Sequence, residues 1–230
     1  MKLQRFFLMQ SIEDNTKLAI PSLELVNQLK RVLRMSSQDE VILFDGSGYE
    51  FLAQIEEIGK DSVSFNVLKK LENASQTSRE TWLFTSIIKK DNFEWIVEKA
   101  TELGVTHIVP IVSSRTEKKD INIDRLNKII IESSEQSGRT KLPILNEVIS
   151  LEDSLNKFKE IKSVAWEPTA KKFVKTDLEN IKGMYVGPEG GFTKEELQLF
   201  EKNGVPLLSL GSQILRAETA VIATLSQLVF

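Results

Sequence analysis

The stretch Met184–Thr193 reads MYVGPEGGFT, and it predicts a buried strand, a tight glycine loop and the start of a helix. Glycine is used where the chain needs a positive φ or where backbone must approach a ligand closely. Thr193, with a glutamate three residues later, has the capping-box pattern of a helix start. Open α/β sheets bind ligands at the carboxyl ends of their strands, so this loop is a candidate ligand site. The alternative is a plain strand-to-helix turn.

The charges near this loop restrict what it could bind. A phosphate cradle needs an uncompensated helix N-terminus, but Glu189 lies in the loop and Glu195 and Glu196 lie in the first helical turn. These carboxylates would repel a polyphosphate and would tolerate a ligand with a positive charge, such as a sulfonium or an ammonium group. The glycine spacing also fails the dinucleotide pattern G-x-G-x-x-G. The sequence therefore argues against a nucleoside triphosphate here.

A second strand, loop and helix of the same type follows at Leu208–Ala220. The predicted strand ends at Leu210, Gly211 begins the loop, and the helix starts near Arg216. We expect this loop to lie beside the first one. Arg216 and Glu218 are the charged residues at the start of an otherwise apolar helix, and an ion pair or a cap is the alternative to a functional role.

From residue 81 onward, short apolar runs alternate with helical periodicity, which is typical of a mainly parallel sheet covered on both faces. The predicted strands are Trp82–Ile88, His107–Val112, Ser163–Trp166, Met184–Gly187 and Pro206–Leu210. The predicted helices start at Asp91 (as a cap), Asn122, Ser150, Thr193 and Arg216. The first of these helices would end at Gly104 and would turn inward Phe93, Ile96, Val97, Ala100 and Leu103.

Residues 1–71 have a different pattern, with short runs of strand-forming residues between turn signals. Asp45–Gly48 predicts a hairpin turn between two of these runs. One helix begins at Pro21-Ser22 and would place on a single face Leu25, Val26, Leu29, Val32 and Leu33. Residues 72–80 are polar and aperiodic. We therefore predict a β-rich domain at 1–71, a linker at 72–80 and an α/β domain at 81–230.

Composition excludes several kinds of site. The chain has no cysteine, which excludes disulfides and cysteine-ligated metals. His107 is the only histidine, and a catalytic triad or a histidine-ligated metal would have to use it. Because it lies in a predicted strand, we interpret it as structural. No apolar run is long enough to cross a bilayer and no secretory signal is evident, so we expect a cytoplasmic protein without a metal.

The net charge of −3 gives no overall attraction to nucleic acid, so an RNA site would have to be a local patch. Basic side chains cluster at Lys30/Arg31/Arg34, Lys89/Lys90, Arg115/Lys118/Lys119 and Arg139/Lys141. Solvated helix ends or loops are the alternative for each cluster.

Two motifs taken together resemble the RsmE family of 16S rRNA (uridine-N3) methyltransferases, within the SPOUT superclass. They are GPEGGF at 187–192 and LG-x-x-ILR-x-ETA at 210–220. Further segments match in order and spacing, namely Lys90–Gly104, Glu135–Arg139, Arg5–Phe7 and Val32–Arg34. The resemblance covers nearly the whole chain. The sequence departs from the family pattern at Asn27 and Gln28, where histidines are usual, and near Gln38, where a glycine is common.

This resemblance implies a PUA-like β-barrel that supports RNA binding, followed by a SPOUT α/β domain tied in a deep trefoil knot. It implies a homodimer, 16S rRNA of the small subunit as partner, and S-adenosylmethionine as methyl donor without a metal. The implied donor-binding residues are Glu167, Gly187, Glu189, Gly190, Gly191, Leu210, Gly211, Ile214, Leu215 and Ala217. For RNA contact we expect Arg5, Arg31, Arg34, Lys89, Lys90 and Arg139.

Methylation at uridine N3 requires alignment of that nitrogen with the methyl carbon and removal of the N3 proton. We predict that Arg216 stabilises negative charge on the base and that Glu189 is the acid–base group, with Arg139 as a further cationic candidate. Two alternatives stay open: a non-catalytic RNA-binding or ribosome-assembly protein that retains the SPOUT fold, and a small-molecule α/β enzyme. The intact glycine loops and Arg216 favour catalysis.

Overall fold

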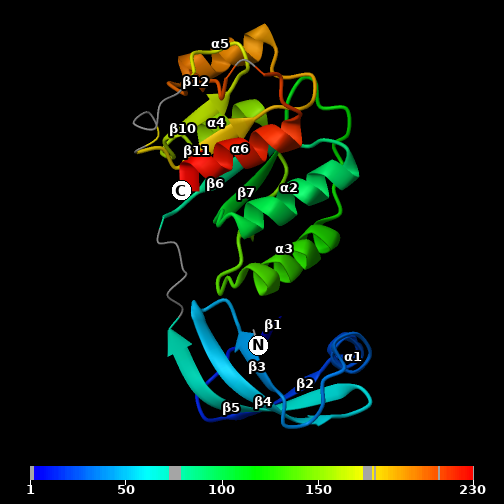
Figure 1. Ribbon diagram of the computed structural model, residues 1–230. Helices are drawn as coiled ribbons and strands as arrows, with labels where there is room; N and C mark the ends of the chain where they lie inside the picture. The colour runs from blue at the N-terminus through cyan, green and yellow to red at the C-terminus, as the bar shows by residue number, and fades with distance from the viewer. Residues whose placement is uncertain (1–2, 73–78, 173–177, 179, 212, 230) are drawn as a thin grey trace. The chain divides into compact units, whose positions relative to one another are not determined.

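A computed structural model describes residues 3–72, 79–172, 178, 180–211 and 213–229, and it divides the chain into two compact units (Figure 1). The first unit comprises Met1–Gln76 and Ser134–Lys141, and the second comprises Thr77–Ser133 and Leu142–Phe230. Most of the predicted linker at 72–80 lies outside the described residues. The domain boundary therefore stays a prediction.

The first unit is built on a five-stranded sheet in the order β1-β3-β4-β5-β2. Its strands are β1 (Gln4–Phe7), β2 (Lys17–Pro21), β3 (Glu40–Phe44), β4 (Tyr49–Ile58) and β5 (Ser62–Glu72). β1 runs parallel to β3 and the other pairs are antiparallel. The predicted hairpin turn joins β3 to β4, with positive φ at Gly46 and Gly48. β2 was not predicted. It lies at the edge of the sheet and ends at Pro21, a position where the missing backbone N–H of proline is tolerated.

The helix of the first unit begins as predicted but does not continue as predicted. Ser22 caps α1 (Leu23–Asn27) by accepting a hydrogen bond from the backbone N–H of Leu25 at 3.1 Å. The chain then widens into a π-helix, η1 (Gln28–Leu33). The wider turn changes which residues face inward. The prediction that Val32 shares one helical face with Leu29 was wrong, because Val32 is 73% exposed whereas Leu29 is fully buried.

The second unit is a seven-stranded sheet with helices, and all of its ladders are parallel. The strand order is β12-β10-β11-β6-β7-β8, with β9 also beside β7. The strands are β6 (Trp82–Ser86), β7 (His107–Val112), β8 (Ile144–Leu145), β9 (Ile149–Ser150), β10 (Ser163–Trp166), β11 (Gly183–Val186) and β12 (Leu207–Leu208). The helices are α2 (Lys90–Glu102), α3 (Ile123–Ser137), α4 (Leu151–Lys157), α5 (Lys194–Lys202) and α6 (Ala217–Val229). The predicted α/β class is confirmed.

Alternation along the strands creates a hydrophobic core on each face of this sheet. In β6, Leu83 belongs to the core that α2, α3 and α6 cover, and α6 lies beside α2 (Figure 1). Trp82 and Phe84 belong to the opposite core, which α4 and α5 cover. Strands buried on both faces explain the continuous apolar runs in the sequence. No helix in the described ranges is both long enough and apolar enough to span a membrane.

Helix α2 starts earlier than the sequence predicted. Its N-terminal cap position is Lys89, which makes no side-chain capping bond, and Asp91 lies inside the first turn. The prediction of Asp91 as the cap was therefore wrong, although a carboxylate in the first turn still complements the helix dipole. The predicted inward residues are confirmed, since Phe93, Ile96, Val97 and Ala100 are almost completely buried.

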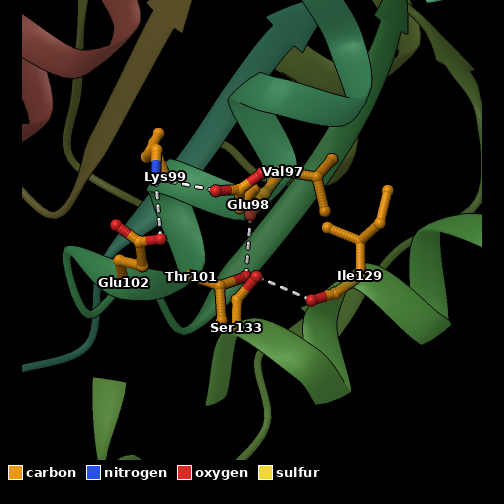
Figure 2. Close-up of polar contacts among 7 residues, drawn as sticks. All are labelled: Val97, Glu98, Lys99, Thr101, Glu102, Ile129 and Ser133. Carbon is orange, nitrogen blue, oxygen red and sulfur yellow. Dashed lines mark hydrogen bonds and ion pairs between the residues drawn. The ribbon is translucent and has the colours of Figure 1, made fainter. Parts of the chain in front are cut away.

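Buried hydroxyl groups lie where α2 faces α3. Thr101 Oγ1 donates to the Val97 carbonyl at 2.8 Å, and Ser133 Oγ donates to the Ile129 carbonyl at 2.7 Å (Figure 2). Each hydroxyl thus has an acceptor within its own helix, so it can be buried without an orphaned donor.

His107 stacks on Trp82, with ring centroids 3.7 Å apart and an interplanar angle of 4°. Its Nδ1 lies 2.9 Å from Thr106 Oγ1. Burial lowers the pKa of His107 below its usual value, and the opposing effect of Glu80 is smaller. These contacts agree with a structural role in β7.

Candidate functional site

Three loops leave the carboxyl edge of the sheet after β10, β11 and β12. Because β10 is parallel to both β11 and β12, all three strands end at the same edge. The strands that lead into the two glycine loops are not adjacent, since β10 lies between them, and the expectation that the loops lie side by side stays a prediction. The loop after β10, which begins with Glu167, therefore leaves the sheet between these two strands. Strand order depends on tertiary pairing, which the local sequence pattern does not specify.

The first glycine loop, Gly187–Phe192, has a defined conformation in which Gly187 and Gly191 have different roles. A Cβ on Gly187 would lie 3.3 Å from the ring of Phe192, so the absence of a side chain allows this buried ring to pack closely. Gly191 has φ +67°, and its N–H donates to the Pro188 carbonyl at 2.8 Å. Apart from its two chain neighbours, no residue that the structure describes has an atom within 4 Å of the position that a Cβ on Gly191 would take, so the loop is open at this residue.

Two charged side chains hold the first glycine loop against the loop after β7, and we call Arg115 and Glu196 the clamp. Arg115 Nη1 donates to the carbonyls of Gly190 at 2.5 Å and Phe192 at 3.3 Å. The Glu196 carboxylate accepts from the N–H groups of Ser114 at 2.7 Å and Thr193 at 2.8 Å. Glu196 is 7% exposed, so these hydrogen bonds offset the cost of burying its charge.

The predicted capping box at Thr193 is confirmed, because Thr193 Oγ1 also accepts from the N–H of Glu196. The sequence did not predict that the same carboxylate reaches the loop after β7. Arg115 was identified only as part of a basic cluster. The clamp joins residues about 80 positions apart, and nothing in either local segment predicts the pairing.

A cluster of buried hydroxyl groups lies beneath the clamp. Ser113 Oγ lies 3.1 Å from Ser86 Oγ at the end of β6 and 3.0 Å from Thr116 Oγ1. Thr116 Oγ1 also accepts from the N–H of Ser113 at 3.0 Å. All three residues are buried, so the loop after β7 is fixed to the sheet before it reaches the clamp.

The second glycine loop, Ser209–Arg216, has fewer described contacts. Ser209 is 2% exposed, and its Oγ donates to the Pro168 carbonyl at 3.1 Å and accepts from the N–H of Gly211 at 3.2 Å. Gly211 has φ +151°. Leu210 and Leu215 pack against the core, Ala217 is buried, and Ile214 is 90% exposed.

Glu167 joins the loop after β10 to β12. Its N–H donates to the Leu208 carbonyl at 2.9 Å, and its Oε1 accepts from Thr169 Oγ1 at 2.9 Å. Its half-buried side chain thus lies at the same edge of the sheet as the two glycine loops.

Glu189 and Arg216, the two predicted catalytic residues, are both exposed. Glu189 lies in the first glycine loop and Arg216 directly precedes α6. No hydrogen bond or ion pair joins the two in the part of the chain that the structure describes. Among the same residues, no group of three or more His, Asp or Glu side chains could hold a metal ion.

The six predicted RNA-binding residues differ in their surroundings. In the first unit, Arg31 and Arg34 are exposed, whereas Arg5 is 9% exposed and pairs with Glu50 at 2.6 Å. Arg139, counted with the first unit, donates through Nε to the Lys141 carbonyl, and burial lowers its pKa to about 10. In the second unit, Lys89 and Lys90 are exposed, and Lys90 lies 3.8 Å from Glu94.

Comparisons with known proteins agree with this architecture. A family model described as an RNA methyltransferase domain matches residues 75–229, and one described as an RNA methyltransferase PUA domain matches residues 26–68. Among curated relatives, the ribosomal RNA small subunit methyltransferase E of Rickettsia conorii is 36% identical, over 99% of this chain and 95% of its own length. The protein of the same name from Bacillus subtilis is 29% identical, over 97% of this chain and 95% of its own length.

Solved structures give the same result. Ribosomal RNA small subunit methyltransferase E from Neisseria gonorrhoeae, bound to S-adenosyl methionine, superposes with a TM-score of 0.90 at 29% identity, over 97% of this chain and 95% of that chain. A methyltransferase from Legionella pneumophila in complex with the same cofactor also gives a TM-score of 0.90 at 29% identity, over 99% of this chain and 97% of that chain.

Proposed function

This chain belongs to the family of RNA methyltransferases that includes ribosomal RNA small subunit methyltransferase E. On that premise, we propose that it methylates N3 of a uridine in 16S rRNA, with S-adenosylmethionine as the methyl donor. The observation that carries the proposal is the first glycine loop, which is fixed by the clamp and yet open at Gly191. A loop of this kind at the carboxyl edge of a parallel sheet suits a ligand that needs close backbone approach.

The residues at this edge fit the donor chemically. Glu189 and the acidic first turn of α5 tolerate a sulfonium, which carries a positive charge. We assign donor binding to the two glycine loops and the loop after β10, through Glu167, Gly187, Glu189, Gly190, Gly191, Leu210, Gly211, Ile214, Leu215 and Ala217. S-adenosylmethionine supplies the methyl group: its sulfur–carbon bond breaks, with the electron pair passing to sulfur, as the nitrogen–carbon bond forms.

Uridine N3 carries a proton at neutral pH, so the protein must remove it and stabilise the resulting anion. We assign proton removal to Glu189, because it is the carboxylate of the loop that holds the donor. We assign stabilisation of the anion to Arg216, because a guanidinium stays charged at every relevant pH. Their separate positions, on the first glycine loop and at the start of α6, would let them approach the base from different sides.

RNA contact is assigned to exposed basic residues of both units. Arg31 and Arg34 from the first unit, and Lys89 and Lys90 from the second, can reach phosphate without breaking a buried contact. Arg5 would have to leave Glu50, and Arg139 is already partly desolvated. We expect Arg34→Glu and Lys90→Glu each to reduce the salt dependence of RNA binding by about one unit of slope, with donor affinity unchanged.

We further propose a cytoplasmic homodimer, with the chain between β10 and α6 tied in the knot of the SPOUT superclass. A two-fold dimer would bring basic clusters of both subunits to one RNA surface. Sedimentation of the purified protein tests the dimer.

Calorimetric titration with S-adenosylmethionine, followed by single-turnover methyl transfer to small ribosomal subunits, tests the proposed function. We expect saturable donor binding and methyl transfer by the wild-type protein. Arg216→Ala should lower the transfer rate by about 100-fold, as for loss of one charge-stabilising group, with donor affinity changed little. Donor binding without any transfer to small-subunit RNA would contradict the proposal, and an unchanged rate in Arg216→Ala would remove its catalytic role.

A further inference from the structure

A cleft of about 380 Å³ lies in the second unit beside the first glycine loop. It is lined by residues that follow the adjacent strands β11, β6 and β7, including the first two residues of α2. They are Ile87, Ile88, Lys89, Lys90, Asp91, Glu117, Lys118 and Glu189. Only Glu189 among them belongs to the residues assigned to the methyl donor. The cleft therefore extends the donor site along the same edge of the sheet.

The cleft has room for one nucleoside and continues outward. A second cleft of about 1010 Å³ shares with it Ile88, Lys90, Glu117 and Lys118, and extends along the start of α3. Volumes in this range are usual for small-ligand pockets. A single nucleotide turned out of its RNA strand could thus occupy the smaller cleft while neighbouring nucleotides follow the larger one.

The charges in the smaller cleft are mixed rather than uniformly basic. Lys89, Lys90 and Lys118 supply three ammonium groups, and Asp91, Glu117 and Glu189 supply three carboxylates. Lys90 is engaged by Glu94, whereas Lys89 and Lys118 form no ion pair within the described ranges. Such a mixture does not favour a polyphosphate, but it can match a base edge that alternates donors and acceptors.

Uracil presents that kind of edge, because its N3–H donor lies between two carbonyl acceptors. A carboxylate can accept the N3–H, and an ammonium group can donate to the O4 carbonyl oxygen and favour the N3 anion. Cytosine has an unprotonated N3 and an exocyclic amino group in place of O4, so a carboxylate placed at N3 and an ammonium group placed at O4 would repel both. Ile87 and Ile88, which directly follow β6, are buried and give the cleft an apolar lining.

We infer that this cleft is the subsite for the target nucleotide, and that Lys118, on the loop after β7, binds uracil O4 and selects uracil over cytosine. The inference rests on the proposed function and extends it to a residue and a loop outside the two glycine loops. The buried hydroxyl cluster and the clamp fix this loop, so Lys118 is presented from a rigid base.

Methylation kinetics of the full-length protein on unmethylated small subunits test the role of Lys118. We expect Lys118→Ala to lower kcat/KM for RNA by about tenfold, as for loss of one charge-assisted hydrogen bond, and to shift the rise of kcat with pH toward higher pH. Lys118→Arg should recover most of the loss. The matched control is Lys202→Ala, which removes an exposed lysine at the end of α5 that lines neither cleft. Equal losses in the Lys118→Ala and Lys202→Ala variants, or no loss in Lys118→Ala, would overturn the inference.

Photo-crosslinking tests the cleft without turnover. We would irradiate the protein with 16S rRNA transcripts containing 4-thiouridine in the presence of S-adenosylhomocysteine. Crosslinks should map to residues 87–91 or 117–118, and crosslinks confined to other segments would overturn the assignment. A wild-type protein that crosslinks there but transfers no methyl group would contradict the proposed function alone. A protein that methylates RNA equally well with Lys118→Ala would contradict the cleft assignment alone.

Discussion

The two glycine loops have the same sequence pattern but different support in the structure. Arg115 and Glu196 hold the first loop through four hydrogen bonds, and its Phe192 is buried. In the described part of the second loop, Ser209 provides the side-chain anchor, and Ile214 is 90% exposed. The first loop is therefore held by charged side chains from distant segments, and the described part of the second loop is anchored by a neutral hydroxyl group. The pattern of a strand, a glycine and a helix in the sequence therefore predicts where a loop lies. The side chains that hold the loop in place come from distant parts of the chain.

The largest effect that we expect comes from Gly191→Val in the first loop. Valine resists φ +67° and would fill the open space beside this residue, so the donor Kd should rise by about 100-fold or more, with the protein still folded. Gly204→Val is the matched control, since Gly204 has φ +70° and equally open surroundings away from the three loops. Calorimetry should show donor binding lost in Gly191→Val alone. Similar donor affinities in the two variants would mean that the first loop has been misassigned.

Gly211→Val applies the same test to the second loop, and we expect it also to abolish donor binding. Its φ of +151° lies near the limit of the region that disfavours side chains, so most of the loss should come from space that the donor needs. Normal calorimetric binding by a folded Gly211→Val protein would exclude this loop from the donor site.

Glu196→Ala removes the buried half of the clamp. Two N–H groups would lose a charged acceptor, so the free energy of unfolding should fall by about 2–3 kcal/mol. Thermal denaturation should show a decrease in Tm of roughly 5–10 °C. Glu195→Ala, which alters the exposed neighbour in the same helical turn, should leave the Tm close to that of the wild-type protein. Equal Tm values for the two variants would contradict the described support of the first loop.

Ser209→Ala is the corresponding change in the second loop, and it should cost less. The lost side-chain hydrogen bonds are neutral, which predicts a decrease in unfolding free energy of about 1 kcal/mol. Denaturant unfolding with and without the donor measures the decrease. A loss as large as that of Glu196→Ala would remove the proposed difference between the loops.

The smallest expected effect lies outside both loops, at His107. Burial lowers its folded-state pKa, so the unfolded chain binds more protons as the pH falls through about 6.5. Stability should therefore decline from that pH down toward the folded-state pKa and then level off. His107→Phe keeps a ring against Trp82 and should flatten this part of the stability profile. Denaturant midpoints at several pH values test this, and an unchanged slope would assign the decline to other groups.

Local sequence predicted much of this architecture, because buried strands and helix caps each have a recognisable residue pattern in the sequence. β7 and β10 have the predicted bounds, and the capping box at Thr193 is present. The position of β10 between β11 and β12, and the clamp, could not be predicted because both depend on pairing between distant segments. The two-residue strands β8 and β9 were missed for the same reason, since only their pairing with β7 defines them.

The central claim is that both loops position a methyl donor for transfer to uridine N3, and isotope labelling tests it most directly. Unmethylated small subunits would be incubated with the purified protein and S-adenosylmethionine that carries a deuterated methyl group. The 16S rRNA would then be digested to nucleosides for mass spectrometry. We predict the label in 3-methyluridine with the wild-type protein and its absence with Gly191→Val. Label in a ribose methyl group, in another base or in no nucleoside would contradict the account.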